Sequence, residues 1–212
     1  MSPSYSVPAE EIRREQIVGN SRFIATLTPV DNDGDAREFI KRIRAEFPDA
    51  THNVPAYIIG GGNSVSEFCS DDGEPSGTAG RPALAVLSGS GLGDVALVVT
   101  RYFGGTKLGK GGLVKAYTES AQMVVNAVQK AHRLEVHVAR LVIPYSLLER
   151  VRLLVKQHDG TILNEDFTAE VTMTIQFPVV KTETFQGTIQ ELSGGKLKAE
   201  IIVTTETLIP VS

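Results

Sequence analysis

Hydrophobic residues change their spacing along the first part of the chain, and each spacing predicts a different element. From Ile12 to Val30, apolar and polar residues alternate loosely around a Gly19-Asn20 turn signal, which is typical of two paired strands. Apolar residues then recur at helical spacing until Pro48, which ends the pattern. This spacing predicts an amphipathic helix that Asp33 or Asp35 caps.

Shorter apolar runs follow this helix and predict the rest of a first α/β layer. We expect strands at Val54 to Ile59 and at Val65 to Cys69, then a short helix from Ala83 to Leu87. The clearest strand runs from Asp94 to Arg101, because its centre is a continuous apolar segment. A long helix with a core-facing apolar stripe is expected from about Leu113 to Lys130.

The pattern restarts after His132 in the order strand, helix, strand, strand, helix, strand, which is the ferredoxin-like β-α-β-β-α-β order. The expected elements are Leu134 to Ile143, Ser146 to His158, Thr161 to Phe167, Ala169 to Phe177, Lys181 to Leu192 and Lys196 to Val203. We therefore predict an α+β protein with a boundary near Ala131. Its domains would be residues 1–131 and residues 132–212, the second ending in a tail after Thr204.

Composition narrows the class of protein. The chain has 212 residues, of which 42% are hydrophobic, so it can bury a core. Its apolar runs are far shorter than the roughly 20 residues of a membrane helix, and its N-terminus lacks the apolar stretch of a secretory signal. The single cysteine, Cys69, excludes an internal disulfide and fits a reducing compartment. We expect a cytoplasmic protein without a membrane partner.

A glycine-rich basic segment between the clearest strand and the long helix, here called the basic loop, is the sharpest local feature. The net charge is -4, yet no acidic residue lies between Asp94 and Glu119. Unshielded amides, a helix N-terminus and lysines together favour a phosphate or another anion. The predicted anion or RNA contacts are Arg101, Tyr102, Phe103, Gly104, Gly105, Lys107, Gly109, Lys110, Gly111, Gly112 and Lys115.

The glycines of the basic loop could also have a purely structural role, serving only close turns and helix-to-sheet packing, and the sequence leaves this alternative open. Gly104 to Lys110 matches the spacing of a nucleotide-binding phosphate loop, but Gly111 stands where a serine or threonine would bind magnesium. This mismatch argues against nucleoside-triphosphate hydrolysis.

Three carboxylates lie close together upstream of the basic loop, at Asp71, Asp72 and Glu74. They could bind a divalent cation or act as an acid and base, but the full calcium-loop pattern is absent. The simpler interpretation is a solvated turn that caps the next helix through Thr78. With Arg81 these residues would form an acidic rim beside the basic loop, and we expect no metal and no cofactor.

The run FCSDDGEPSGTAGRP, followed by VVTRYFGGTKLGKGGLVKAY, resembles the paired signature of the YigZ/Impact family. The resemblance covers essentially Ile12 to Val203. It implies a first domain that is a β-α sandwich similar to domain IV of elongation factor G, and a ferredoxin-like second domain similar to its domain V. It also implies that the two runs form one site.

Three functions are compatible with these features. The first is a translation-associated protein that contacts RNA or the ribosome through the basic loop, with salt-sensitive binding. The second is a protein-interaction adaptor, because the eukaryotic relatives regulate translation by competing for the activator of an initiation-factor kinase. The third is an enzyme acting on a phosphorylated small molecule. The basic loop favours the first function, and binding is favoured over catalysis.

Overall fold

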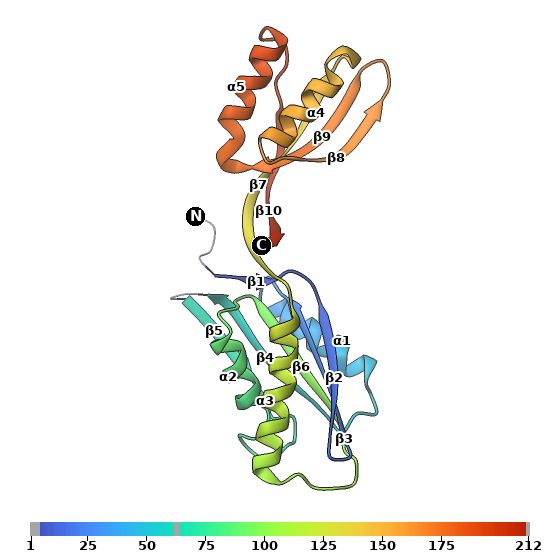
Figure 1. The fold of residues 1–212 in the computed structure, drawn as a ribbon, viewed down its shortest axis with the longest axis vertical. Coiled ribbons are helices and arrows are strands. Elements are labelled where there is room, and N and C mark those ends of the chain that lie inside the picture. The colour runs from blue at the N-terminus through green and yellow to red at the C-terminus, as the bar shows by residue number, and fades with distance from the viewer. Residues whose placement is uncertain (1–4, 62–63, 211–212) are drawn as a thin grey trace. The chain divides into compact units, whose positions relative to one another are not determined.

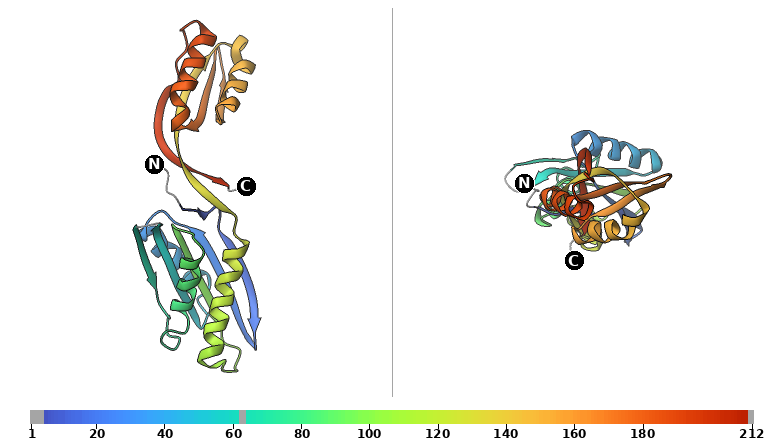
Figure 2. Two further views of the ribbon diagram at one scale, coloured as in Figure 1. Left: turned by 60° about the vertical axis from the view of Figure 1, so that its left-hand side comes forward. Right: turned by 90° about the horizontal axis from the view of Figure 1, so that it is seen from above.

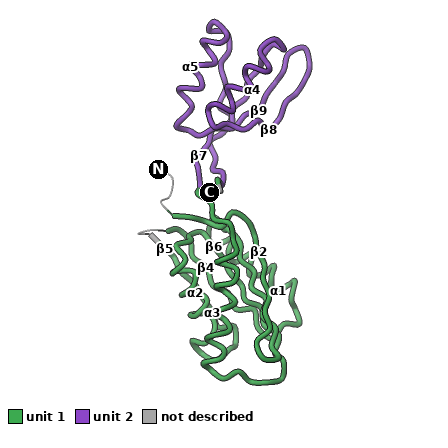
Figure 3. The backbone as a smooth tube through the Cα atoms, in the orientation of Figure 1, with its two compact units in different colours: residues 1, 3–132, 209–212 green, residues 2, 133–208 purple. Residues whose placement is uncertain are grey.

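A computed structural model describes residues 5–61 and 64–210, and it shows a mixed α/β protein with two compact units (Figure 1). The first unit extends to residue 132 and includes the end of the last strand, and the second unit holds residues 133–208 (Figure 3). The prediction of a two-domain α+β chain is confirmed. The outer limits of the expected domains, residues 1 and 212, lie outside the described residues.

The first unit is built on a five-stranded sheet with the strand order β2-β3-β6-β4-β5, in which neighbouring strands are antiparallel. The strands are β2 (Ile12–Val18), β3 (Ser21–Pro29), β4 (His52–Gly61), β5 (Ser64–Cys69) and β6 (Val95–Tyr102). β6 occupies the centre because its apolar residues are buried on both faces of the sheet. β5 is an edge strand.

Helices cover both faces of this sheet, α1 (Asp33–Glu46) on one side and α2 (Gly80–Gly89) with α3 (Gly109–Ala127) on the other (Figure 2). Alternation along β6 divides its side chains between the two layers. Ala96 and Val98 pack into the cluster with α1, whereas Val95, Leu97 and Val99 belong to the cluster with α2 and α3. The two cores therefore follow directly from the period-two pattern of one strand.

Two helix ends differ from the expected ones. The N-cap of α1 is Asn32, whose side chain accepts a hydrogen bond from the amide of Asp35 at 3.0 Å, so neither Asp33 nor Asp35 is the cap. α3 begins at Gly109 instead of Leu113 and ends at Ala127, because Val128 is extended. The last glycines of the basic loop therefore lie in the first turn of a helix.

The second unit has a four-stranded core sheet with the order β10-β7-β9-β8, which is the ferredoxin-like arrangement. Its elements are β7 (Lys130–Ile143), α4 (Leu148–Gln157), β8 (Thr161–Phe167), β9 (Val171–Pro178), α5 (Thr182–Ser193) and β10 (Glu200–Pro210). Short 3-10 turns, Tyr145–Leu147 and Val179–Lys181, lead into the two helices. Phe177 and Phe185 pack against each other in the core between sheet and helices.

Two strands of the second unit, β7 and β10, are longer than expected. β7 runs without a break from Lys130, so the chain has no loop at Ala131, and the short strand β1 (Val7–Pro8) pairs with its first residues. β10 continues to Pro210, so no tail follows Thr204; its β-branched residues suit a strand throughout. Within the described residues, no helix is long and apolar enough to cross a bilayer.

Candidate functional site

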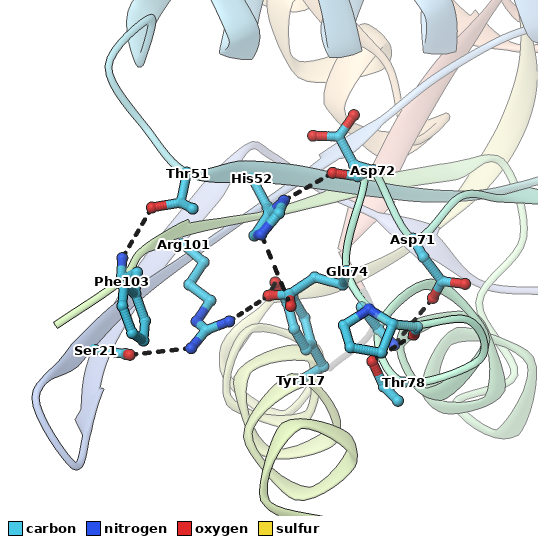
Figure 4. Close-up of polar contacts among 12 residues, drawn as sticks. Ser21, Thr51, His52, Asp71, Asp72, Glu74, Thr78, Arg101, Phe103 and Tyr117 are labelled. Carbon is cyan, nitrogen blue, oxygen red and sulfur yellow. Dashed lines mark hydrogen bonds and ion pairs between the residues drawn. The ribbon is translucent and has the colours of Figure 1, made fainter. Parts of the chain in front are cut away.

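The acidic segment lies in the loop between β5 and α2, and its three carboxylates have three different roles (Figure 4). Asp71 accepts hydrogen bonds from the amides of Gly77, Ala79 and Gly80 at 2.8, 3.1 and 2.9 Å. It therefore satisfies two of the free donors at the start of α2, the amides of Ala79 and Gly80. This corrects the expected cap, since the Thr78 hydroxyl donates to the Pro75 carbonyl instead, at 2.7 Å.

The ionisation of Asp71 is linked to these bonds. Burial alone would raise the pKa of this carboxyl, but the amides of Gly77, Gly80 and Ala79 lower the pKa below its usual range. Replacing Asp71 with alanine should cost about 1–2 kcal/mol of stability at neutral pH, as for other lost helix caps. Because the folded pKa is lowered, this contribution is lost as pH falls, so the difference between variant and parent in chemical unfolding should shrink below about pH 4.

Asp72 ties the same loop to α1 and β4. Its carboxylate accepts from the Asn53 amide at 2.7 Å and from the Arg44 guanidinium at 2.6 Å. Its own carbonyl lies 2.8 Å from Nδ1 of His52. Asp72 adopts a positive φ of 46°, which these three contacts hold in place. Asp72 therefore has a structural role, because it joins the loop to α1 and β4.

Glu74 is buried, with 8% of its surface exposed, and it forms an ion pair of 2.6 Å with Arg101, which is 5% exposed. The Tyr117 hydroxyl donates to the same carboxylate at 2.8 Å, and Nε2 of His52 lies 3.8 Å from it. We expected Glu74 on a solvated rim and Arg101 on an exposed loop. Both lie inside because Arg101 shares the sheet face of Val99, which α2 and α3 cover.

These residues, together with Ser21, form the Glu74 cluster: Ser21, His52, Glu74, Arg101 and Tyr117 (Figure 4). The Arg101 guanidinium donates to Ser21 Oγ at 3.2 Å and lies over the rings of Phe23 and Phe103, 5.4 and 5.5 Å from their centroids. Burial, and then the Glu74 charge, raise the pKa of Tyr117 far above its usual range, so its hydroxyl stays a donor.

The cluster joins the two sequence runs through a single carboxylate. Glu74 comes from the first run, whereas Arg101 and Tyr117 come from the second. Sequence reasoning missed Ser21 and His52 as members. Ser21 follows the turn of the first hairpin and is fully buried, but a serine at a hairpin carries no signal that it meets an arginine 80 positions away.

The glycines of the basic loop fall into three groups. A Cβ on Gly104 would lie 1.8 Å from the carbonyl oxygen of Asn20, so this glycine serves close packing. Gly105 and Gly109 have φ values of 85° and 72°, which favour glycine. A Cβ on Gly111 would meet nothing within 4 Å, and its φ lies outside the left-handed region. Neither packing nor backbone geometry requires a glycine at position 111.

Cationic side chains and free amides gather at the start of α3. Lys107 and Lys110 are exposed, and the first turn of α3 contains no acidic residue. Leu108 stands at the N-cap and supplies no side-chain acceptor, so the amides of the first turn have no partner within the helix. Lys115 is also exposed and lies 3.8 Å from Glu119, one helical turn on.

The remaining predicted residues lie around this surface. Phe103 is 45% exposed, and its amide donates to Thr51 Oγ1 at 2.9 Å. The Tyr102 hydroxyl donates to Asp49 at 2.9 Å. Gly112 belongs to the first turns of α3, where a Cβ would lie 3.1 Å from Leu108 Cβ. Arg81 is exposed at the start of α2.

The described residues 5–61 and 64–210 contain no group of three or more His, Cys, Asp or Glu side chains placed to hold a metal ion. Burial, followed by the charge of Asp71, raises the pKa of the Cys69 thiol, which disfavours the reactive thiolate. The basic loop, with its exposed lysines and the amides at the start of α3, is therefore the part of the predicted site that is open to a ligand.

Comparison with known proteins identifies the family of the chain. Residues 19–125 match the Impact N-terminal domain, and residues 141–196 match a domain of unknown function (DUF1949). IMPACT family member YigZ of Escherichia coli (strain K12) is 36% identical over 196 residues, which is 92% of this chain and 96% of that protein. IMPACT family member YvyE of Bacillus subtilis (strain 168) is 35% identical over 196 residues, 92% of this chain and 90% of that one.

A solved structure is also similar over nearly the whole length. The crystal structure of a hypothetical protein has 36% sequence identity and a TM-score of 0.62, covering 96% of this chain and 99% of the other. The fold is therefore shared with an experimentally determined relative.

Proposed function

The chain belongs to the Impact family, and we propose that it is a translation-associated binding protein that contacts RNA or the ribosome through the basic loop. The observation that carries this proposal is the start of α3. Gly111 has no side chain to shield the backbone amides of this turn, and neither packing nor backbone geometry requires a glycine there. Lys107 and Lys110 are exposed in the same segment. Amides at a helix N-terminus flanked by lysines are suited to a phosphate group.

Contacts of the Glu74 cluster and of Thr51 position the start of the basic loop. Glu74 neutralises Arg101 in the interior, so the exposed charge of the loop comes from its lysines. Ser21 Oγ accepts from the Gly104 amide at 3.3 Å, and Thr51 Oγ1 accepts from the Phe103 amide, so both contacts fix the point where the chain leaves β6. A loop held in this way loses little conformational freedom on binding.

The test is association of the purified protein with ribosomes and with structured RNA in a sedimentation assay at low and moderate salt. Replacing Lys107 and Lys110 together with alanine should weaken association more than tenfold near 0.1 M salt, because each lost phosphate contact removes about one released counterion. The matched control replaces Lys196 and Lys198, two exposed lysines of the second unit, and changes the net charge equally.

The fold should tolerate both double substitutions, because changes at exposed positions usually stay within about 0.5 kcal/mol. Equal association of parent and loop variant at every salt concentration would refute the proposal. Binding to a translation protein without ribosomes or RNA would instead favour the adaptor function implied by the eukaryotic relatives.

A further inference from the structure

A concave surface lies in the first unit, on the opposite face of the sheet from α3. This cavity of about 360 Å³ is formed by α1, β4, β5 and the residue that follows β5. It is lined by Arg37, Ile40, Lys41, Arg44, Pro55, Tyr57, Phe68 and Ser70. Its volume falls within the roughly 300–1,000 Å³ that small-molecule sites occupy. None of these residues belongs to the basic loop or to the Glu74 cluster.

One wall of the cavity carries positive charge. Arg37, Lys41 and Arg44 are spaced four and three residues apart on α1, so they lie on one face of the helix, along roughly 10 Å of its length. Arg37 pairs with Asp33 and Arg44 with Asp72, each at 2.6 Å through a single nitrogen, which leaves further guanidinium donors.

Lys41 differs from the two arginines. Among the described residues it has no ion-pair partner, and it is exposed. The three cations of this wall are therefore balanced by only two carboxylates, those of Asp33 and Asp72. The excess positive charge is that of Lys41, which lies between the two arginines along α1. A ligand that fits this wall is an anion with several acceptor oxygens, of which a phosphate is the simplest.

The floor and the opposite wall are apolar and aromatic. Ile40, Pro55 and Tyr57 are buried and form the floor. Phe68 on the edge strand β5 is paired with Tyr57 on β4, and their rings are stacked with centroids 5.0 Å apart and planes 22° apart. Phe68 remains 41% exposed, so part of its ring is available to a ligand. An exposed aromatic ring is a platform on which a nucleobase can stack.

From these walls we infer that the cavity binds a nucleotide, with the base against Phe68 and the phosphate between Lys41 and Arg44. Charge alone would also attract an acidic peptide, but a peptide of acidic side chains makes no use of an exposed ring. The concave shape and the combination of one aromatic platform with one cationic wall favour a ligand that carries both a planar ring and a phosphate. The nucleotide can be free or part of a single strand.

The experiment is calorimetric titration of the full chain at low salt with 5′-AMP, adenosine, inorganic phosphate and a single-stranded adenylate tetranucleotide. We expect 5′-AMP to bind at least about tenfold more tightly than adenosine or phosphate, because only 5′-AMP engages both walls. Equal affinity for 5′-AMP and the tetranucleotide identifies a free nucleotide as the ligand. Tighter binding of the tetranucleotide identifies a strand, and both outcomes support the site.

Two substitutions test the contributions of the aromatic wall and the cationic wall to binding separately. Phe68→Leu keeps an apolar side chain but removes the ring, and it should weaken 5′-AMP binding about tenfold, within the usual contribution of stacking. Lys41→Gln should weaken 5′-AMP binding and leave adenosine binding unchanged, because adenosine has no phosphate. Lys196→Gln is the control for charge. The Lys107→Ala/Lys110→Ala variant should bind 5′-AMP like the parent, so this inference stands or falls separately from the function of the basic loop.

The site is refuted if 5′-AMP does not bind, or if it binds Phe68→Leu as tightly as the parent. It is also refuted if the loop variant loses 5′-AMP binding, since the nucleotide would then lie at the start of α3. A hexaglutamate peptide that binds where 5′-AMP does not would overturn the nucleotide and indicate an acidic protein segment as the occupant.

Discussion

Replacing Glu74 with glutamine should destabilise the first unit by about 3–5 kcal/mol, because the charge of Arg101 would remain buried without its carboxylate. Arg101 is almost fully enclosed and already has one nitrogen, Nε, without a hydrogen-bond partner. The substitution keeps the shape of the side chain, so the lost charge is the main change. Tyr117 can still donate to the amide oxygen, which limits the loss to the ion pair.

Amide hydrogen exchange of β6 measures the stability of the first unit separately from that of the second. Replacing both partners with apolar residues, Glu74→Leu with Arg101→Met, should recover part of the loss, since no unpaired charge is left inside. If Glu74→Gln lowers the stability of the first unit by less than about 1 kcal/mol, the result would contradict a buried ion pair between Glu74 and Arg101.

Replacing Gly104 with alanine should cost about 3 kcal/mol or more, at the upper end for overpacked sites. The new Cβ would lie 1.8 Å from the carbonyl oxygen of Asn20 and 2.0 Å from its carbon, and no side-chain rotation can relieve a clash with backbone. The turn of the first hairpin or the exit of β6 would have to move. This shift would also disturb Ser21, which holds both Gly104 and Arg101.

The matched substitution is Gly111→Ala in the same loop, where a Cβ has open space. Alanine is the better helix former, so this variant should be as stable as the parent or more stable by up to about 1 kcal/mol. Thermal unfolding of the two variants side by side separates packing glycines from open ones. Equal stability of Gly104→Ala and the parent would contradict the close contact between Gly104 and the backbone of Asn20.

Most strands and the order of the second half could be predicted from the sequence, because local patterns determine them. β8 matches its expected limits, Thr161–Phe167, since a glycine and the polar turn bound its alternation. The start of α3 was misplaced because Gly109, Gly111 and Gly112 are poor helix formers, and only the folded context places them in a first turn. The unbroken passage of β7 through Ala131 has no local signal either.

The candidate site was predicted in part. Arg101 was expected to be a site residue but an exposed one, although alternation along β6 places it on the same face as the buried Val99. Nothing local distinguishes Glu74 from Asp71 and Asp72, and only the three-dimensional path of the loop decides which carboxylate meets Arg101. The cationic cavity was not predicted, because it combines a stripe on α1 with a ring on the edge strand β5.

The salt dependence of RNA or ribosome binding tests the proposed function most directly. The logarithm of the binding constant should fall linearly with the logarithm of salt concentration for the parent. For Lys107→Ala/Lys110→Ala the slope should be smaller by about 1.4–1.8, which corresponds to two lost phosphate contacts, whereas Lys196→Ala/Lys198→Ala should keep the parental slope. Parallel lines for the parent and the loop variant would contradict the basic loop as the phosphate contact.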